Sequence, residues 1–149
     1  MRAVVTRVTS ASVHVEDTLV AAIERGLLVL VGVAARDVEN DAVLLARKIA
    51  GLRIFADEMG AMNRNVADVR GAVLLVSQFT LLGDARHGRR PSFVAAANPV
   101  LGRSLFERVV ADLNEARLPL QTGTFGATMA VTSINDGPVT ILLDTAKLF

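Results

Sequence analysis

The feature that most constrains this sequence is a continuous apolar run, residues 72–76, that stops abruptly at two polar residues. The run is short, contains two valines and is preceded by a glycine, which is typical of a strand buried on both faces. Ser77 and Gln78 follow it directly, and Phe79 and Thr80 come next. Polar side chains at the end of a core strand often belong to a binding or catalytic site, but they can equally be an ordinary strand-ending turn. Position alone leaves both interpretations open.

Other strands are predicted around this run. A second unbroken apolar segment, residues 27–33, predicts another core strand, and alternating apolar residues predict partly exposed strands. The alternating segments are residues 2–8, 11–15, 18–23, 127–134 and 139–143.

Two helices are predicted from apolar residues at helical spacing. The first follows Asp37, which we expect to be its N-cap. The second starts at Asn98, with Pro99 at the first helical position. Runs of strands with two helices between them predict an α+β domain with a mixed or largely antiparallel sheet. A chain of 149 residues is expected to form a single domain, residues 1–149.

Composition narrows the class of protein. Hydrophobic residues make up 52% of the chain, so we expect part of the apolar surface to be buried between subunits. No segment reaches the roughly 18 apolar residues of a membrane span, and the first residues lead into a strand pattern rather than a signal peptide. The sequence has no cysteine, which excludes disulfides and a thiolate nucleophile and indicates a reducing cytoplasm.

A short basic segment, Arg86-His87-Gly88-Arg89-Arg90, is a candidate phosphate-binding loop. The net charge of +1 does not by itself indicate a nucleic-acid partner, but 14 of the 16 basic residues are arginine. Arginine binds phosphate in a forked geometry that lysine lacks. Codon bias in an alanine-rich gene explains the arginine excess equally well, and a solvated basic turn explains the loop.

The segment Asn135-Asp136-Gly137-Pro138 is a strong turn signal between two predicted strands. The bond before proline is the one peptide bond that becomes cis at a reasonable cost, usually in a tight turn. An ordinary hairpin turn is the simpler interpretation.

The usual signatures of hydrolases and nucleotide-binding proteins are absent. The sequence contains no GxSxG, Walker or HExxH motif. A Ser-His-Asp triad would need His14 or His87, and neither lies in a pocket-like context. No metal site is predicted.

Taken together, these segments resemble the bacterial and eukaryotic type of D-aminoacyl-tRNA deacylase. The matching segments occur in the family's order and spacing and cover nearly the whole chain. They are RAVVTRVTSASV, LARKIAGLRIF, the pair Met62-Asn63, SQFTLLGD, GRRPSF and NDGPVT.

The resemblance implies a homodimeric, barrel-like fold and an esterase activity. The substrate would be a D-amino acid joined to the terminal adenosine of tRNA, with mischarged glycyl-tRNA as a second substrate. No cofactor, DNA or membrane partner is implied.

It also implies roles for particular residues. Ser77, Gln78, Phe79 and Thr80 would line the catalytic pocket. The pair Gly137-Pro138 would be joined by a cis bond and would enter the partner subunit's pocket, where it excludes L side chains. Met129 would also contact the substrate, and Arg86, Arg89 and Arg90 would bind tRNA.

Two questions stay open at this point. Either the ribose 2′-hydroxyl assists attack by water, or Thr80 is a covalent nucleophile, although no base is visible near it in the sequence. The chain could also be an RNA-binding or metabolite-binding module without turnover, but the intact SQFT and Gly-Pro motifs favour an enzyme.

Overall fold

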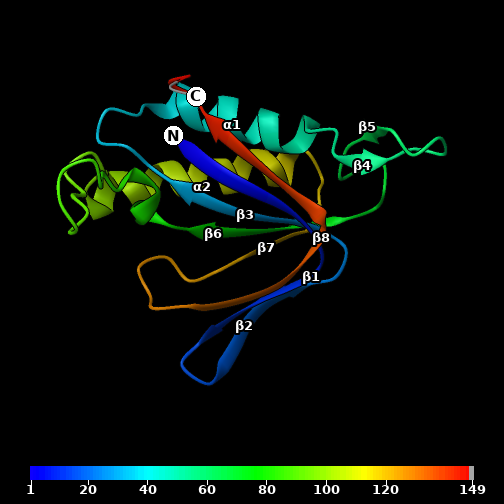
Figure 1. Cartoon of the computed structure of the whole chain (residues 1–149), viewed down its shortest axis with the longest axis horizontal. Coiled ribbons are helices and arrows are strands. Elements are labelled where there is room, and N and C mark those ends of the chain that lie inside the picture. Colours follow the sequence, from blue (N-terminus) through cyan, green and yellow to red (C-terminus); the bar gives the residue numbers. More distant parts are fainter. Residues whose placement is uncertain (148–149) are drawn as a thin grey trace.

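The computed structural model describes residues 1–147, and residues 148 and 149 lie outside this part of the chain. Two helices, α1 (Glu39–Gly51) and α2 (Pro99–Glu115), pack together on one face of a strongly curved sheet (Figure 1). The strands of this sheet are β1 (Arg2–Val15), β2 (Thr18–Ile23), β3 (Gly26–Gly32), β6 (Ala72–Ser77), β7 (Leu120–Thr122) and β8 (Ala130–Asp144). A small hairpin of β4 (Phe55–Ala56) and β5 (Met62–Arg64) extends to one side. The prediction of an α+β domain with two main helices is therefore confirmed.

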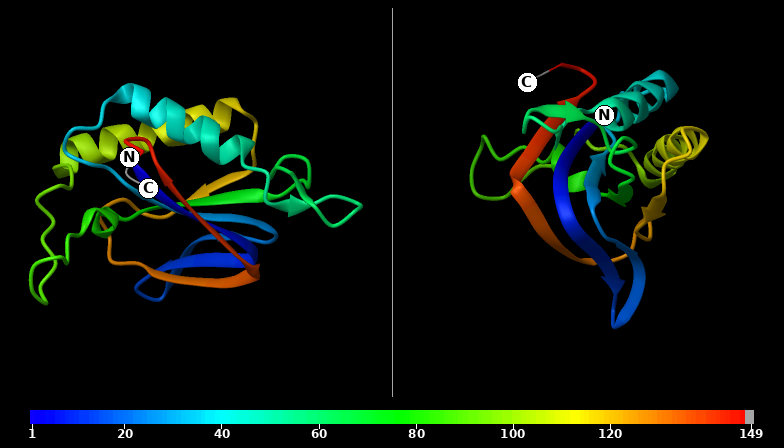
Figure 2. Two further views of the ribbon diagram at one scale, coloured as in Figure 1. Left: turned by 45° about the horizontal axis from the view of Figure 1, so that its top comes forward. Right: turned by 90° about the vertical axis from the view of Figure 1, so that its right-hand side faces the viewer.

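The sheet is mixed and bends into a nearly closed, barrel-like shape (Figure 2). Its order is β2-β1-β3-β6-β7, and β8 pairs with the other side of β1. The pairs β3–β6 and β6–β7 are parallel, whereas β1 is antiparallel to β2, β3 and β8. The first half of β1 pairs with β3 and its second half with β2, so this one long strand carries the sheet around the bend.

Strand β6 is the centre of the core, as its apolar run predicts. Val73 and Leu75 belong to the larger core between the sheet and the helices. Leu74 and Val76, which alternate with them along the strand, belong to a second core cluster. All four side chains are buried, so the strand is fixed from both faces, and its last residue, Ser77, is held at a defined place.

Strands β1 and β8 are longer than predicted. The sequence predicts two shorter strands in place of β1 and two in place of β8. Both β1 and β8 are continuous because they pair with each other along nearly their whole length. The segment 135–138 is therefore not a hairpin turn, and that interpretation is wrong. It is a bulge: Asn135 pairs with Val8 and Thr140 with Thr6, so four residues of β8 stand opposite Arg7 alone. Proline is tolerated here because this part of the edge strand makes no ladder hydrogen bonds.

The start of α1 also differs from the prediction. The N-cap is Val38, not Asp37. Asp37 is buried instead, where its carboxylate accepts hydrogen bonds from the Met1 ammonium at 2.8 Å and the Ala34 N–H at 2.6 Å. This long-range ion pair outweighs the local capping preference.

The start of α2 is confirmed. The Asn98 carboxamide oxygen accepts a hydrogen bond from the Leu101 N–H at 3.0 Å, and Pro99 is the first helical residue. Neither helix in the described part of the chain is long and apolar enough to cross a membrane.

Candidate active site

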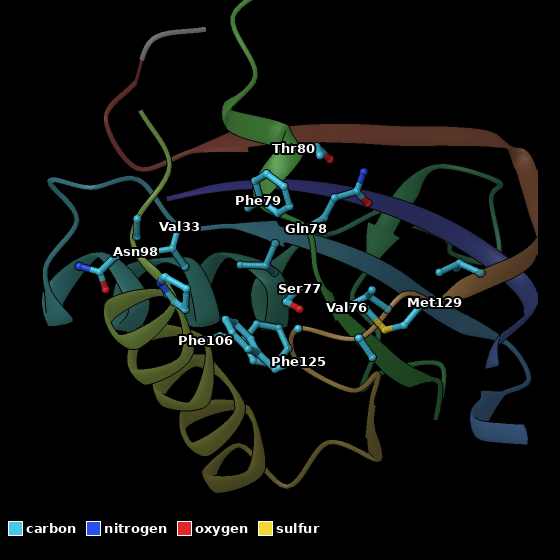
Figure 3. Close-up of a pocket in the computed structure, with 17 residues that line it drawn as sticks. Val33, Val76, Ser77, Gln78, Phe79, Thr80, Asn98, Phe106, Phe125 and Met129 are labelled. Carbon is cyan, nitrogen blue, oxygen red and sulfur yellow. The ribbon is translucent and has the colours of Figure 1, made fainter. Parts of the chain in front are cut away.

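A pocket of about 600 Å³ opens where β6 ends (Figure 3). Its walls come from the ends of β3 and β6, the 3₁₀ turn η1 (Phe79–Leu82), the start of α2 and the segment that leads into β8. The lining residues are Val31, Val33, Val76, Ser77, Gln78, Phe79, Thr80, Ala97, Asn98, Pro99, Gly102, Phe106, Phe125, Gly126, Ala127, Met129 and Val131. The four residues predicted as catalytic and Met129 thus meet at one cavity.

The pocket lining is mostly apolar and includes a few polar side chains. Ser77 lies between Phe79 on one side and Phe106 and Phe125 on the other (Figure 3). The Phe106 and Phe125 rings are 5.9 Å apart, and the Arg103 guanidinium lies 4.7 Å from the centre of the Phe125 ring. An apolar cavity with a small number of placed polar groups is the usual form of a small-molecule site.

No residue that lines the pocket is titratable. Its polar side chains are neutral hydroxyls and carboxamides, from Ser77, Gln78, Thr80 and Asn98. Within residues 1–147, no group of three or more acidic, histidine or cysteine side chains is arranged to hold a metal ion. Any proton transfer in this pocket must therefore involve the bound molecule or water rather than a carboxylate or imidazole of the wall.

The backbone N–H groups of Phe79 and Thr80, two residues that line the pocket, make no hydrogen bond within residues 1–147. The Gln78 N–H donates to the Val31 carbonyl at 2.7 Å, and the Leu81 N–H donates to the Gln78 carbonyl at 3.3 Å. Between them, the N–H groups of Phe79 and Thr80 have no acceptor within the described residues. Free N–H groups at a cavity can hold a negative oxygen, which is the requirement for stabilising an ester-hydrolysis intermediate.

The turn η1 is held by contacts that sequence reasoning missed. The Arg2 guanidinium donates to the Leu81 carbonyl at 3.0 Å, and it also forms an ion pair with Asp144 at 3.1 Å. Gly32 packs against the turn so closely that an added Cβ would lie 2.6 Å from the Leu82 side chain. These partners are far apart in the sequence, so no local pattern signals them.

The Gly137-Pro138 segment lies outside this pocket in the single chain. Both residues are exposed, and the bond between them is cis, which confirms that part of the prediction. Gly137 has φ = +130°, and an added Cβ would lie 2.8 Å from the Val139 side chain. The segment is anchored by Arg7, whose guanidinium contacts both the backbone and the carboxylate of Asp136. Sequence reasoning did not single out Arg7.

The basic loop lies between η1 and α2 and projects from the body of the molecule (Figure 2). Its arginines are not equivalent. Arg86 makes a two-pronged ion pair with Asp84, at 2.9 and 2.6 Å, which lowers the pKa of that carboxyl and raises the pKa of the guanidinium. Arg89 and Arg90 are exposed and have no ion-pair partner within residues 1–147.

Comparison with known proteins identifies the family. A family model described as D-Tyr-tRNA(Tyr) deacylase matches residues 4–144. The chain belongs to this deacylase family. Relatives in Thermotoga petrophila and Koribacter versatilis, both named D-aminoacyl-tRNA deacylase, are each 58% identical over 149 residues and are matched over the full length of both chains.

Two solved structures are similar to this deacylase-family chain. One, titled "c-Myc DNA Unwinding Element Binding Protein", has a TM-score of 0.91 and 38% identity, with 97% of this chain and 99% of that chain covered. Another is titled "Structural Analysis of a probable eukaryotic D-amino acid tRNA deacylase" and has a TM-score of 0.83. Its identity is 17%, with 95% of this chain and 97% of that chain covered, so it supports the fold alone.

Proposed function

We propose that this member of the deacylase family hydrolyses the ester that joins a D-amino acid to the terminal adenosine of tRNA. The observation that carries this proposal is the full-length match to the family, together with a pocket at the family's SQFT segment. Ser77, Gln78, Phe79 and Thr80 are assigned to that pocket as its catalytic segment.

The chemistry requires little from side chains. An aminoacyl ester is already activated, so hydrolysis needs a positioned water and stabilisation of the developing oxyanion. The free N–H groups of Phe79 and Thr80 can supply that stabilisation. The ribose 2′-hydroxyl, which is adjacent to the ester, can assist the attack of water in place of a side-chain base. Thr80 has no base within the pocket lining to activate it, so we favour water over Thr80 as the nucleophile.

Chiral selection is assigned to Gly137 and Pro138 of a second subunit. Both residues are exposed in the single chain and line no part of its own pocket, which fits a role in the pocket of a partner. Among the strands of residues 1–147, β8 pairs with β1 alone, and it exposes Val131, Ile134 and Leu142, as expected of a surface that a second copy covers.

In this proposal the main chain of the partner holds the amino group of the substrate, and Met129 contacts the bound amino acid. Backbone atoms make a stiffer wall than a side chain that can rotate away. An L side chain would meet that wall, whereas glycine has no side chain and would pass, which makes glycyl-tRNA a second substrate.

The deciding experiment is a deacylation assay with one tRNA charged with a D-amino acid, the matching L-amino acid or glycine. We expect rapid hydrolysis of the D and glycyl esters and little of the L ester. Light scattering on the same sample tests the homodimer. If tRNA binds without any ester cleavage, the chain is a binding module and the proposal is wrong.

A further inference from the structure

A second hollow of about 470 Å³ lies beside the active-site pocket and has no role in the function proposed above. It is lined by Arg90, Pro91, Ser92 and Phe93, at the end of the basic loop. Its wall adjoins the pocket wall, because the Phe93 ring meets the Phe79 ring edge to face, with centres 5.2 Å apart. Phe79 lines the pocket and Phe93 lines the hollow, so the contact between the two rings joins the two cavities.

Phe79 and Phe93 are both exposed, although they are large apolar side chains. Phe79 is 58% exposed and Phe93 is 38% exposed. Phe93 is nevertheless held in place: Gly83 lies so close that an added Cβ would be 3.0 Å from the ring. Backbone hydrogen bonds between Asp84 and Ser92 close the base of the loop, at 2.8 Å each. A ring that is fixed on one side and open on the other is suited to stacking against a flat partner.

The charge beside this ring is positive and unneutralised. Arg90 lines the same hollow as Phe93 and has no acidic partner in the described part of the chain. Arg89 precedes it and is equally free, whereas Arg86 is occupied by Asp84. An exposed aromatic ring next to free arginines is the combination that binds single-stranded nucleic acid, with the base stacked on the ring and the phosphate held by the cation.

We infer that this hollow binds the nucleotide that precedes the terminal adenosine of the substrate, with its base stacked on Phe93 and its phosphate on Arg90. This inference rests on the proposed function, in which the aminoacylated adenosine occupies the neighbouring pocket. The two cavities are adjacent, because the Phe79 and Phe93 rings are in contact. The enzyme then binds the last two nucleotides of the single-stranded end together, and these contacts add affinity beyond any contact with the body of the tRNA.

The test compares two esters of the same D-amino acid, one on adenosine alone and one on a trinucleotide that ends in the aminoacylated adenosine. The measured quantity is the ratio of kcat/KM for the trinucleotide to kcat/KM for the mononucleoside. We expect the wild-type ratio to be well above one. Phe93→Leu should lower it by about 5- to 150-fold, the scale of one base–aromatic stack. Phe93→Trp should keep it.

Two further variants make the test robust. Arg90→Ala should lower the same ratio at low salt and lose its effect at high salt, because its contact is to phosphate. Val94→Ala is the matched control, since Val94 is the next residue, is 89% exposed and lines neither cavity. It should leave the ratio unchanged.

The outcomes separate the two proposals. If the wild-type protein cleaves neither ester nor charged tRNA, the proposed function fails, and this inference fails with it. If both esters are cleaved at a wild-type ratio near one, the function stands and the inference is overturned. It is also overturned if Phe93→Leu and Arg90→Ala both behave like Val94→Ala.

Discussion

Arg7 on β1 holds Asp136 on β8 through a single nitrogen. Its Nε donates to the Asp136 backbone carbonyl at 3.2 Å and lies 3.0 Å from the Asp136 carboxylate. A second nitrogen donates to the Ile54 carbonyl at 2.6 Å, so the guanidinium is fixed from two directions. Asp136 directly precedes Gly137, and Arg7 is therefore the anchor of the segment to which we assign chiral selection.

Replacing this anchor should weaken selectivity. We expect Arg7→Ala to raise the rate on an L-aminoacyl-tRNA relative to the matching D substrate, because the Asp136 carbonyl loses its donor. The measurement is the D/L ratio of kcat/KM. Arg47→Ala, which removes an exposed arginine from α1, is the control. An unchanged ratio in Arg7→Ala would show that the bulge holds its shape without this contact.

Gly137→Ala should destabilise the fold. The residue has φ = +130°, and a new Cβ would lie 2.8 Å from the Val139 side chain and 3.0 Å from the Arg7 guanidinium. Strain of this kind typically costs about 1–3 kcal/mol. Gly51→Ala is the matched control, because Gly51 ends α1 and a Cβ there meets nothing within 4 Å. Urea unfolding of both variants measures the difference, and equal free energies of unfolding would contradict the prediction.

Thr80→Ala should keep substantial activity. The pocket lining contains no base that could activate the Thr80 hydroxyl, whereas the backbone N–H of residue 80 survives the substitution. Single-turnover rates on a D-aminoacyl-tRNA measure the effect on the chemical step. A loss of about 10⁶-fold, the scale for removing a true nucleophile, would instead indicate that Thr80 is the covalent nucleophile.

The pH dependence of the reaction should not come from a side chain of the protein. Histidine is the side chain whose ordinary pKa lies between about 5 and 8, and the two histidines, His14 and His87, line no part of the pocket. We expect kcat/KM of the variant with both histidines changed to glutamine to follow the wild-type curve throughout that range. Uncatalysed hydrolysis of the same ester gives the reference curve. Loss of an inflection in the variant would reveal a histidine in the mechanism.

Asp84→Asn should strengthen tRNA binding. The carboxylate neutralises Arg86, and this pairing lowers the pKa of Asp84, so the pair persists at neutral pH and breaks only when acid protonates the carboxylate. Removing the charge frees Arg86 for a phosphate and should steepen the salt dependence of binding by about one phosphate contact. Asp17→Asn removes an equal charge from the β1–β2 turn and is the control.

The triple variant of Arg86, Arg89 and Arg90 to alanine should have the opposite effect on the same measurement. Its tRNA binding should be weaker and less sensitive to salt, with little change in the single-turnover rate. An unchanged salt dependence would mean that the basic loop is only a solvated turn.

Much of this protein could be predicted from local sequence pattern. The buried strand that ends at Ser77 and the start of α2 at Asn98 were predicted correctly, because burial and capping depend on residues close together in the chain. The motifs that indicated the family are likewise contiguous. Residues 77–80 line one pocket because they are consecutive and begin at the end of one strand.

The tertiary structure decided the rest, because the remaining contacts join residues far apart in the sequence. The sequence predicts Asp37 as an N-cap, but its carboxylate is buried in an ion pair with the Met1 ammonium. Residues 135–138 have turn chemistry, but pairing on both sides with β1 turns them into a bulge opposite Arg7. The exposed pair of Phe79 and Phe93 likewise exists only after the loop folds back. Local propensities amount to about 1 kcal/mol each, so long-range pairing and burial prevail wherever the two disagree.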